Sequence, residues 1–272
     1  CCFQKTQESV IDALASLCIN NVPISNRIAM NHSVLSKVMH LVRDSKPSTR
    51  LLAVKLLANL NKCGSLQNQV HLNDITSSVL PVLVKLMGDG AVVKDQTPNI
   101  LATLISGSEE LQKAACDANA VPKLVSFLQD SSVTDLMRVN CLNALAELCM
   151  MREQGRRLLI ESKVLPYLIQ LLPSSNEQIK CATLACIKGI SRATKHFRLS
   201  LIECGILNNL FQLLNDASLV VRREACAVIA NLSLDFSPVK QFVFNNGGVE
   251  ILVSLTASNN SSDVSLRTTS LI

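Results

Sequence analysis

The chain has 272 residues, which is enough for one large domain, two domains or an extended array of repeats. Apolar residues make up 48% of it, aromatic residues only 3%, and tryptophan is absent, so a core must be built from aliphatic side chains, alanine and cysteine. The net charge of +5 is spread along the chain, whereas nucleic-acid-binding proteins usually cluster their lysines and arginines.

The first helix is expected at the start of the chain. The run TQESVIDALASLC, which begins at Thr6, places Val10, Leu14 and Leu17 at helical spacing. We expect it to be the last helix of an earlier repeat unit, with these three side chains on its apolar face. Because the chain opens without a methionine and ends inside an amphipathic pattern, we expect it to be an internal piece of a longer protein.

One segment then recurs six times. It has the form apolar-apolar-x-x-Leu-Val-x-Leu-Leu, as in VLPVLVKLM from Val79 and VLPYLIQLL from Val164. The third residues of the copies, which follow one another at steps of 45, 41, 44, 42 and 42, are Ser36, Pro81, Pro122, Pro166, Asn208 and Glu250. Proline at this place fits the first turn of a helix. Self-similarity at this period indicates stacked repeats.

A second helix follows each copy. It opens with a basic residue, has a small residue three positions later, and continues with apolar residues at the spacing of one helical face. The basic residues are Arg50, Lys94, Arg138, Lys180, Arg222 and Arg267. The small residue matters because two helices that cross closely need a side chain that leaves room.

A shorter third helix links one unit to the next, as in SPVKQFVFNNGG, and glycine at 205 and at 247–248 fits its C-terminal end. Three helices in about 42 residues are typical of the armadillo unit. We therefore predict an all-α, armadillo-type, right-handed superhelical solenoid that forms a single domain over residues 1–272. The predicted units are approximately 1–31 (partial), 32–75, 76–118, 119–162, 163–204, 205–246 and 247–272 (partial).

Pro98 interrupts the second helix of one unit, because a proline inside a helix removes a hydrogen bond. Either that helix starts late, near Gln96, or it is kinked at the proline. The irregularity fits a repeat with a longer loop, and the alternative is a functional feature.

The basic residues have a structural and a functional interpretation. Asp44 and Asp216 each lie six residues before a basic position, and such a loop carboxylate can accept a hydrogen bond from the neighbouring unit and cap the second helix. We favour the structural interpretation, a series of contacts that joins each repeat unit to the next (the structural ladder), over a row of basic residues that binds a ligand. Its predicted members are Asp44, Arg50, Arg138, Asp216 and Arg222.

The opposite face of the second helices is expected to line a concave groove, because residues nine apart differ by about half a turn. Asparagine at regular spacing can hold the backbone of an extended peptide through both its donor and its acceptor. The alternative is that this face simply contacts water. The candidate groove residues are Lys55, Asn59, Asn99, Asn143, Glu147, Arg223 and Asn231.

The repeat resembles the armadillo family along nearly the whole chain. The C-terminal part, with LSLDFSPVK from Leu232 and GVEILVSLT from Gly248, resembles the armadillo repeat-containing protein 8 family, the armadillo subunits of the CTLH, or glucose-induced-degradation-deficient, ubiquitin ligases. The resemblance implies a non-catalytic scaffold that tethers a substrate receptor to a RING-containing core. It also implies a receptor peptide bound in the concave groove.

No pattern of catalytic, cofactor-binding or metal-ligating residues occurs in the sequence. We therefore expect no enzyme, no cofactor, no small-molecule substrate and protein partners only. The alternatives are a general armadillo or HEAT adaptor for another acidic or extended peptide, or a nucleic-acid- or lipid-associated solenoid. The eleven cysteines form no CxxC pair, which favours a reducing compartment, cytoplasm or nucleus, and no long apolar run predicts a membrane span.

Overall fold

The computed structural model describes residues 2–66, 68–89, 91–192, 195–234 and 237–257. Helices are the regular elements of these residues, and no strand occurs among them, so the all-α prediction is confirmed. The chain divides into two compact units between Gly155 and Arg156, and each is described by itself. The helix α11 (Glu153–Glu161) spans this division.

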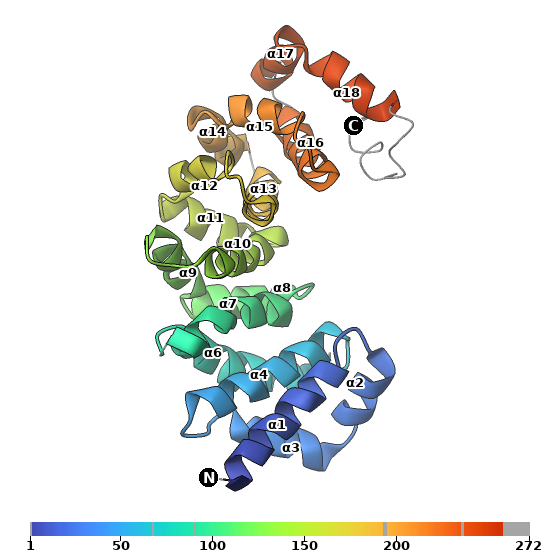
Figure 1. The fold of residues 1–272 in the computed structure, drawn as a ribbon, viewed down its shortest axis with the longest axis vertical. Helices are drawn as coiled ribbons and strands as arrows, with labels where there is room; N and C mark the ends of the chain where they lie inside the picture. The colour runs from blue at the N-terminus through green and yellow to red at the C-terminus, as the bar shows by residue number, and fades with distance from the viewer. Residues whose placement is uncertain (1, 67, 90, 193–194, 235–236, 258–272) are drawn as a thin grey trace. The chain divides into compact units, whose positions relative to one another are not determined.

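The first unit contains long helices separated by pairs of shorter ones (Figure 1). The long helices are α1 (Cys2–Leu17), α4 (Pro47–Lys62), α7 (Ala91–Ile105) and α10 (Asp135–Met150). The shorter ones are α2 (Val22–Ala29), α3 (His32–Leu41), α5 (Gln69–Asp74), the π-helix η1 (Ile75–Val79), α6 (Leu80–Leu86), α8 (Glu109–Asp117) and α9 (Ala120–Gln129). Consecutive long helices pack on one another, α1 on α4, α4 on α7 and α7 on α10.

Local sequence signals set where several of these helices begin. The side chains of Asn31, Asn68, Ser108 and Thr134 each accept a hydrogen bond from a backbone N–H in the first turn of the helix that follows. Such a cap satisfies one of the backbone donors that have no partner within the helix. Pro47 lies in the first turn of α4, where a missing N–H costs little, whereas Pro81 lies just after η1 within a longer helical run.

The core of the first unit is the stack of long helices. The predicted small residues Ala53, Thr97 and Cys141 are fully buried, and so are the apolar residues that follow them on the same face. The prediction for α1 was wrong, because Ile11 and Ala15 are its buried residues, whereas Val10 and Leu17 are 52% and 53% exposed and Leu14 is half-buried. The side that includes Ala15 lies against α4, since the Asn59 amide of α4 donates to the Ala15 carbonyl.

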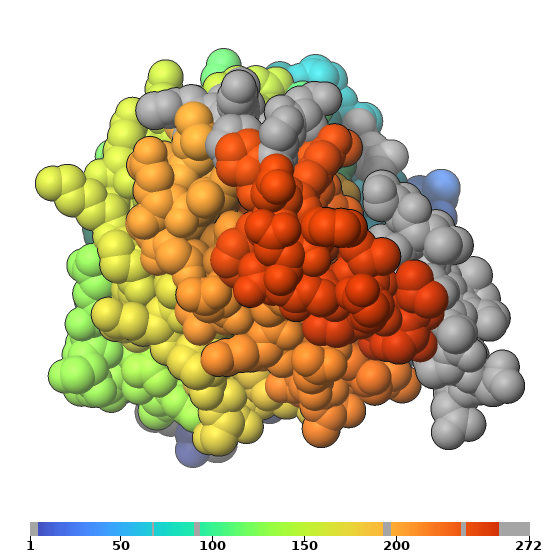
Figure 2. All heavy atoms as spheres, turned by 90° about the horizontal axis from the view of Figure 1, so that it is seen from above, coloured from blue at the N-terminus to red at the C-terminus, as the bar shows by residue number. Residues whose placement is uncertain are grey.

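The second unit repeats the pattern. Its long helices are α13 (Glu177–Ser191) and α16 (Leu219–Ser233), which pack on each other. The shorter helices are α12 (Leu165–Leu171), α14 (Lys195–Glu203), α15 (Ile206–Leu213), α17 (Ser237–Asn245) and α18 (Gly248–Ala257). Figure 2 looks onto the face where α17 and α18 lie against α15 and α16. There Phe211 and Phe242 meet edge to face at 5.3 Å, and a side chain at Gly248 would come within 2.8 Å of the Phe211 ring.

The turn before the repeated segment is made by a left-handed residue at four equivalent places. These residues are Asn119, Lys163, Gly205 and Gly247, with φ of 61°, 56°, 79° and 71°. The corresponding place between α5 and α6 holds the π-helix η1 instead, so residues 69–86 continue as one helical run. A π-turn absorbs an extra residue without breaking the helix, which matches the longest step of 45 residues in the repeat.

Pro98 lies inside α7, which begins at Ala91, so the expectation that this helix starts late, near Gln96, was wrong. The missing N–H of Pro98 leaves the Lys94 carbonyl without its helical donor. Side chains bind the carbonyls on either side, because the Thr97 hydroxyl donates to the Val93 carbonyl at 2.7 Å and the Asn140 amide donates to the Asp95 carbonyl at 3.2 Å. The helix α7 continues through the proline.

The left-handed residues yield a test of the fold. Lys163 is exposed and lies in a region where an L side chain costs about 1–2 kcal/mol, whereas glycine enters it freely. Replacement by glycine, as nature has it at 205 and 247, should therefore stabilise the protein. We expect Lys163→Gly to raise the free energy of unfolding by about 0.5–1 kcal/mol after the entropy of glycine is subtracted, measured by urea denaturation. Lys163→Ala is the control, and an equal gain from alanine would contradict the backbone explanation.

Candidate functional site

A hollow of about 760 Å³ in the first unit is the candidate site. It lies along the long helices, and residues from the end of α1 and from α4, α7 and α10 line it. Three of the seven predicted groove residues, Lys55, Asn59 and Asn99, are among them. The other lining residues are Cys18, Ile19, Asn20, Ala58, Lys62, Cys63, Asp95, Gln96, Ile100, Thr103, Leu136 and Asn140.

Two of the lining asparagines hold neighbouring helices together. The Asn59 amide on α4 donates to the Ala15 carbonyl on α1 at 2.8 Å. The Asn140 amide on α10 donates to the Asp95 carbonyl on α7 at 3.2 Å. Because an amide side chain has two N–H donors and a carbonyl acceptor, each retains further hydrogen-bonding capacity toward the hollow.

Lysine side chains give the hollow most of its charge. Lys55 forms an ion pair with Asp12 of α1 at 2.7 Å, while Lys62 is exposed at the other end of α4. Asp95 contributes a carboxylate from α7. The mixture of signs does not form the single basic stripe that a nucleic-acid backbone requires.

Asn99 and Asn143 differ from Asn59, because no hydrogen bond joins either side chain to another residue in the described part of the chain. Asn99 is exposed in the hollow, and the Thr103 hydroxyl next to it bonds to the Asn99 backbone carbonyl at 2.9 Å. Asn143 is half-buried on α10 and does not line the hollow. Both amides keep their full donor and acceptor capacity.

Glu147 is half-buried one turn beyond Asn143. Burial raises the pKa of its carboxyl group above the ordinary 4.5, and the Ser106 hydroxyl and the charge of Lys62 offset part of this effect. This carboxylate therefore interacts with the ends of α4 and α7 and does not line the hollow.

The two remaining predicted groove residues, Arg223 and Asn231, lie in the second unit on α16. The Asn231 amide donates to the Ser191 hydroxyl of α13 at 2.9 Å, so it joins two long helices as Asn59 does. Arg223 lies 3.5 Å from Glu224 on the same helix. The structure thus brings Lys55, Asn59 and Asn99 together in one hollow.

The predicted ladder residues fall into two groups. Two carboxylates in loops do bind a basic residue of the preceding repeat, because Arg50 pairs with Asp89 at 3.2 Å and Lys180 pairs with Asp216. Asp44 instead accepts from the Lys46 backbone N–H at 2.8 Å, which is a local turn.

Two arginines differ from the predicted arrangement. Arg138 pairs at 2.9 Å with Asp135, one turn earlier on α10, because a carboxylate at that spacing lies on the same helical face. The Nε of Arg222 is buried without a hydrogen-bond partner among the described residues, although its charge helps to lower the pKa of Asp216.

Two inter-helix contacts have no counterpart in the sequence interpretation. Lys188 of α13 pairs with Glu224 of α16. The buried amide of Asn61 on α4 donates to the Leu104 carbonyl of α7 at 2.9 Å. Neither residue type recurs at the equivalent place in other repeats, so the periodic pattern carried no signal for them.

No group of three or more His, Cys, Asp or Glu side chains in the described part of the chain is placed to hold a metal ion. No described helix is both long and apolar enough to cross a bilayer. Burial raises the pKa of the free thiols of Cys116 and Cys141 to about 12, so both behave as small apolar core residues.

Comparison with solved structures decides the fold class. An engineered protein aligns with a TM-score of 0.82 at 21% identity, over 98% of this chain and 63% of that one. A designed armadillo repeat protein in complex with the peptide (KR)4 aligns with a TM-score of 0.73 at 23% identity, over 87% of this chain and 98% of that one. The chain has the armadillo-repeat fold.

Two curated proteins match more than four fifths of the chain in sequence. GID complex subunit 5 of Schizosaccharomyces pombe is 28% identical over 84% of this chain and 32% of its own length. Armadillo repeat-containing protein 8 of Danio rerio is 26% identical over 82% of this chain and 36% of its own length. The chain therefore spans about a third of the length of these relatives. No family model matches the chain.

The Lys180–Asp216 pair provides a test of the contacts between neighbouring repeats. Both side chains are largely buried, at 14% and 13% exposure. Burial acts to raise the pKa of Asp216, but the hydrogen bonds from Lys180 and from the Ser218 N–H, with the nearby positive charges, lower it below the ordinary 3.8. Asp216→Asn should therefore destabilise the protein at pH 7 by about 1–3 kcal/mol, measured by urea denaturation.

The pH dependence of this loss follows from the direction of the pKa shift. A lowered pKa means that the carboxylate stabilises the folded state above 3.8 and that this contribution is lost as the pH falls through the folded-state value. The difference between Asp216→Asn and the unmodified protein should thus shrink at acid pH. Asp44→Asn removes a carboxylate from the equivalent loop and is the matched control, expected to cost less. Equal losses from both variants would contradict the role of Asp216 in joining neighbouring repeats.

Proposed function

We propose that the chain is part of a non-catalytic scaffold that binds an extended segment of a partner protein in the groove formed by α4, α7 and α10. The observation that carries this proposal is the amide-lined hollow of about 760 Å³ on consecutive long helices. An extended peptide exposes one N–H and one C=O per residue, and amide side chains can bind both.

The spacing of the lining residues supports an elongated partner. Lys55 and Asn59 are one turn apart on α4, and Asp95, Asn99 and Thr103 repeat that spacing on α7. Side chains on parallel helices thus form rows across the hollow, while Ile19 and Leu136 provide exposed apolar surface at its edges. Such a surface suits a segment with polar backbone contacts and a few apolar side chains.

The relatives support a role in a multi-subunit complex. One is named as a subunit of the GID complex, and the other as an armadillo repeat protein. We propose that this chain likewise belongs to a RING-type E3 ubiquitin ligase of the CTLH kind, in which the groove docks the substrate receptor. Residence in the cytoplasm or nucleus is part of the same proposal.

Gln96 and Asn99 of α7 are the residues on which to test the groove, because both are exposed in the hollow and no hydrogen bond joins either side chain to a neighbouring helix among the described residues. Two hydrogen bonds lost from the interface should weaken binding about tenfold, which corresponds to about 1.4 kcal/mol. We expect Gln96→Ala with Asn99→Ala to reduce the recovery of RING and LisH/CTLH-domain proteins with the tagged full-length protein, measured by quantitative mass spectrometry.

The control is Asn208→Ala, which removes an exposed amide from α15, a helix that does not line the hollow. Far-ultraviolet circular dichroism should show equal helix content in all variants. Unchanged recovery with the double variant would refute the groove proposal. A binding constant that falls steeply with salt would instead favour a nucleic acid as the ligand.

A further inference from the structure

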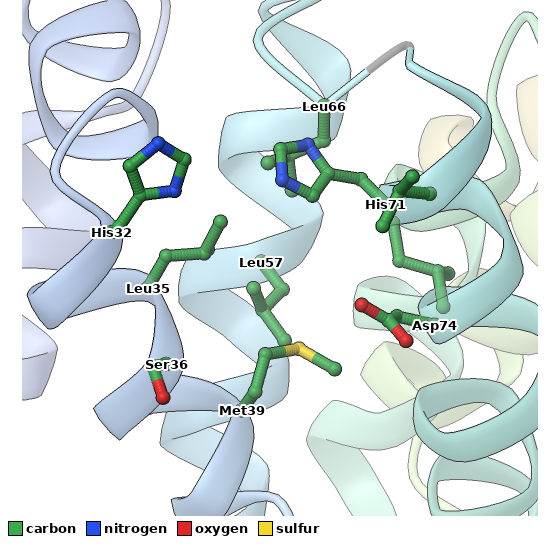
Figure 3. A pocket seen from close by; sticks show the side chains of 10 residues that line it. His32, Leu35, Ser36, Met39, Leu57, Leu66, His71 and Asp74 are labelled. Carbon is green, nitrogen blue, oxygen red and sulfur yellow. The ribbon is translucent and has the colours of Figure 1, made fainter.

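A second hollow of about 340 Å³ lies outside the groove, between α3, α4 and the run formed by α5 and η1 (Figure 3). Its floor is apolar, because Leu57, Leu66 and Ile75 are almost completely buried. Leu35 and Met39 of α3 form one wall. The volume is at the lower end of the range of about 300–1,000 Å³ for small-molecule sites, which suits one or two side chains better than a large cofactor.

The hollow lies at an irregular joint between repeats. Where the four later joints have a left-handed residue, the chain here continues through the π-helix Ile75–Val79. The helical run carries His71, Asp74 and Ile75 along one edge of the hollow. π-turns inside helices frequently mark functional sites.

Two imidazoles and one carboxylate provide the polar groups of this pocket. His32 from α3 and His71 from α5 lie toward one end of the hollow, and Asp74 lies three residues after His71 on the same helix (Figure 3). The Nδ1 atom of His71 is buried and has no hydrogen-bond partner among the described residues. A smaller hollow of about 230 Å³ adjoins the first, since both histidines also line it.

The rim of the two hollows is apolar and exposed. Val70 is 68% exposed beside the larger hollow, and Met30 is 77% exposed beside the smaller one. Buried aliphatic floor, exposed aliphatic rim and a few hydrogen-bonding groups are the features of a pocket that receives an anchor side chain at a protein interface.

The charge of the lining residues restricts the occupant. Asp74 is the one carboxylate among the described residues that line the two hollows, and no lysine or arginine lines either of them. A cation beside the anchor would complement Asp74. Since the search of the described residues found no metal-binding cluster, these histidines do not constitute a metal site.

We propose that this pocket docks a second protein partner by accepting an aliphatic side chain, of leucine or methionine size, that is flanked by a lysine or arginine. The aliphatic group fills the hollow over Leu57 and Ile75, and the cation pairs with Asp74. This site is separate from the groove and does not depend on the function proposed for it.

The test uses a displayed library of short random peptides as the probe. Peptides are selected on the intact chain and counter-selected on Ser36→Trp, which places a large ring over the pocket from an exposed position that lines it. Ser33→Trp is the matched control, because Ser33 is exposed on the same helix and does not line the pocket. Circular dichroism checks that both variants fold.

We expect the selected peptides to share an aliphatic residue next to a lysine or arginine. They should bind Ser33→Trp as well as the unmodified chain and bind Ser36→Trp about tenfold more weakly, as should peptides in which alanine replaces the aliphatic residue. Asp74→Asn should weaken binding more than Glu203→Gln, a charge loss in the second unit.

The proposal is overturned if no peptide family survives counter-selection, if Ser36→Trp binds as tightly as Ser33→Trp, or if the aliphatic residue is dispensable. The groove variant Gln96→Ala with Asn99→Ala separates the two sites. Loss of peptide binding in that variant would place the peptide in the groove and refute the pocket while leaving the groove proposal intact.

Discussion

The close packing of consecutive long helices is the constraint on which the rest of the structure depends. Besides packing on the shorter helices of its own repeat, each long helix packs on the next within its compact unit, α1 on α4, α4 on α7, α7 on α10 and α13 on α16. The buried small residues Ala53, Thr97 and Cys141 allow this approach. It also brings side-chain amides within reach of backbone carbonyls on the neighbouring helix, and Asn59, Asn61 and Asn140 each make such a contact.

This constraint decides which polar side chains of the long helices are engaged within the stack. Asn59 and Asn231, each nine residues after the basic residue of its repeat, donate to the neighbouring long helix and have less capacity left for a partner. Asn99, five residues after Lys94, is exposed in the hollow and makes no such contact within the described residues. The two positions of the repeat thus place the same residue type in different surroundings, and the contacts of each side chain distinguish them.

Periodicity explains which features were predictable from the sequence. Elements that recur from one repeat to the next, such as the long helices and their small residue, were placed correctly in the described residues, because several copies reinforce one pattern. The last copy of the second helix, with Arg267, lies outside the described residues. Features that depart from the repeat at a single place were not predicted correctly. The buried face of α1 was misassigned because the pattern there occurs once, and the π-helix Ile75–Val79 was missed because an extra residue shows only as a longer step. The partners of Arg138 and Arg222 depend on single neighbours, which the recurring pattern does not specify.

The most direct measurement of the central claim is site-specific photo-crosslinking in cells. A benzophenone amino acid at Thr103, in the groove, is compared with the same residue at Lys113, an exposed position on α8 that does not line it. The account predicts a crosslink from position 103 to a subunit of a RING-type ubiquitin ligase complex, and none from 113. A crosslink to such a subunit from 113 and not from 103 would contradict it.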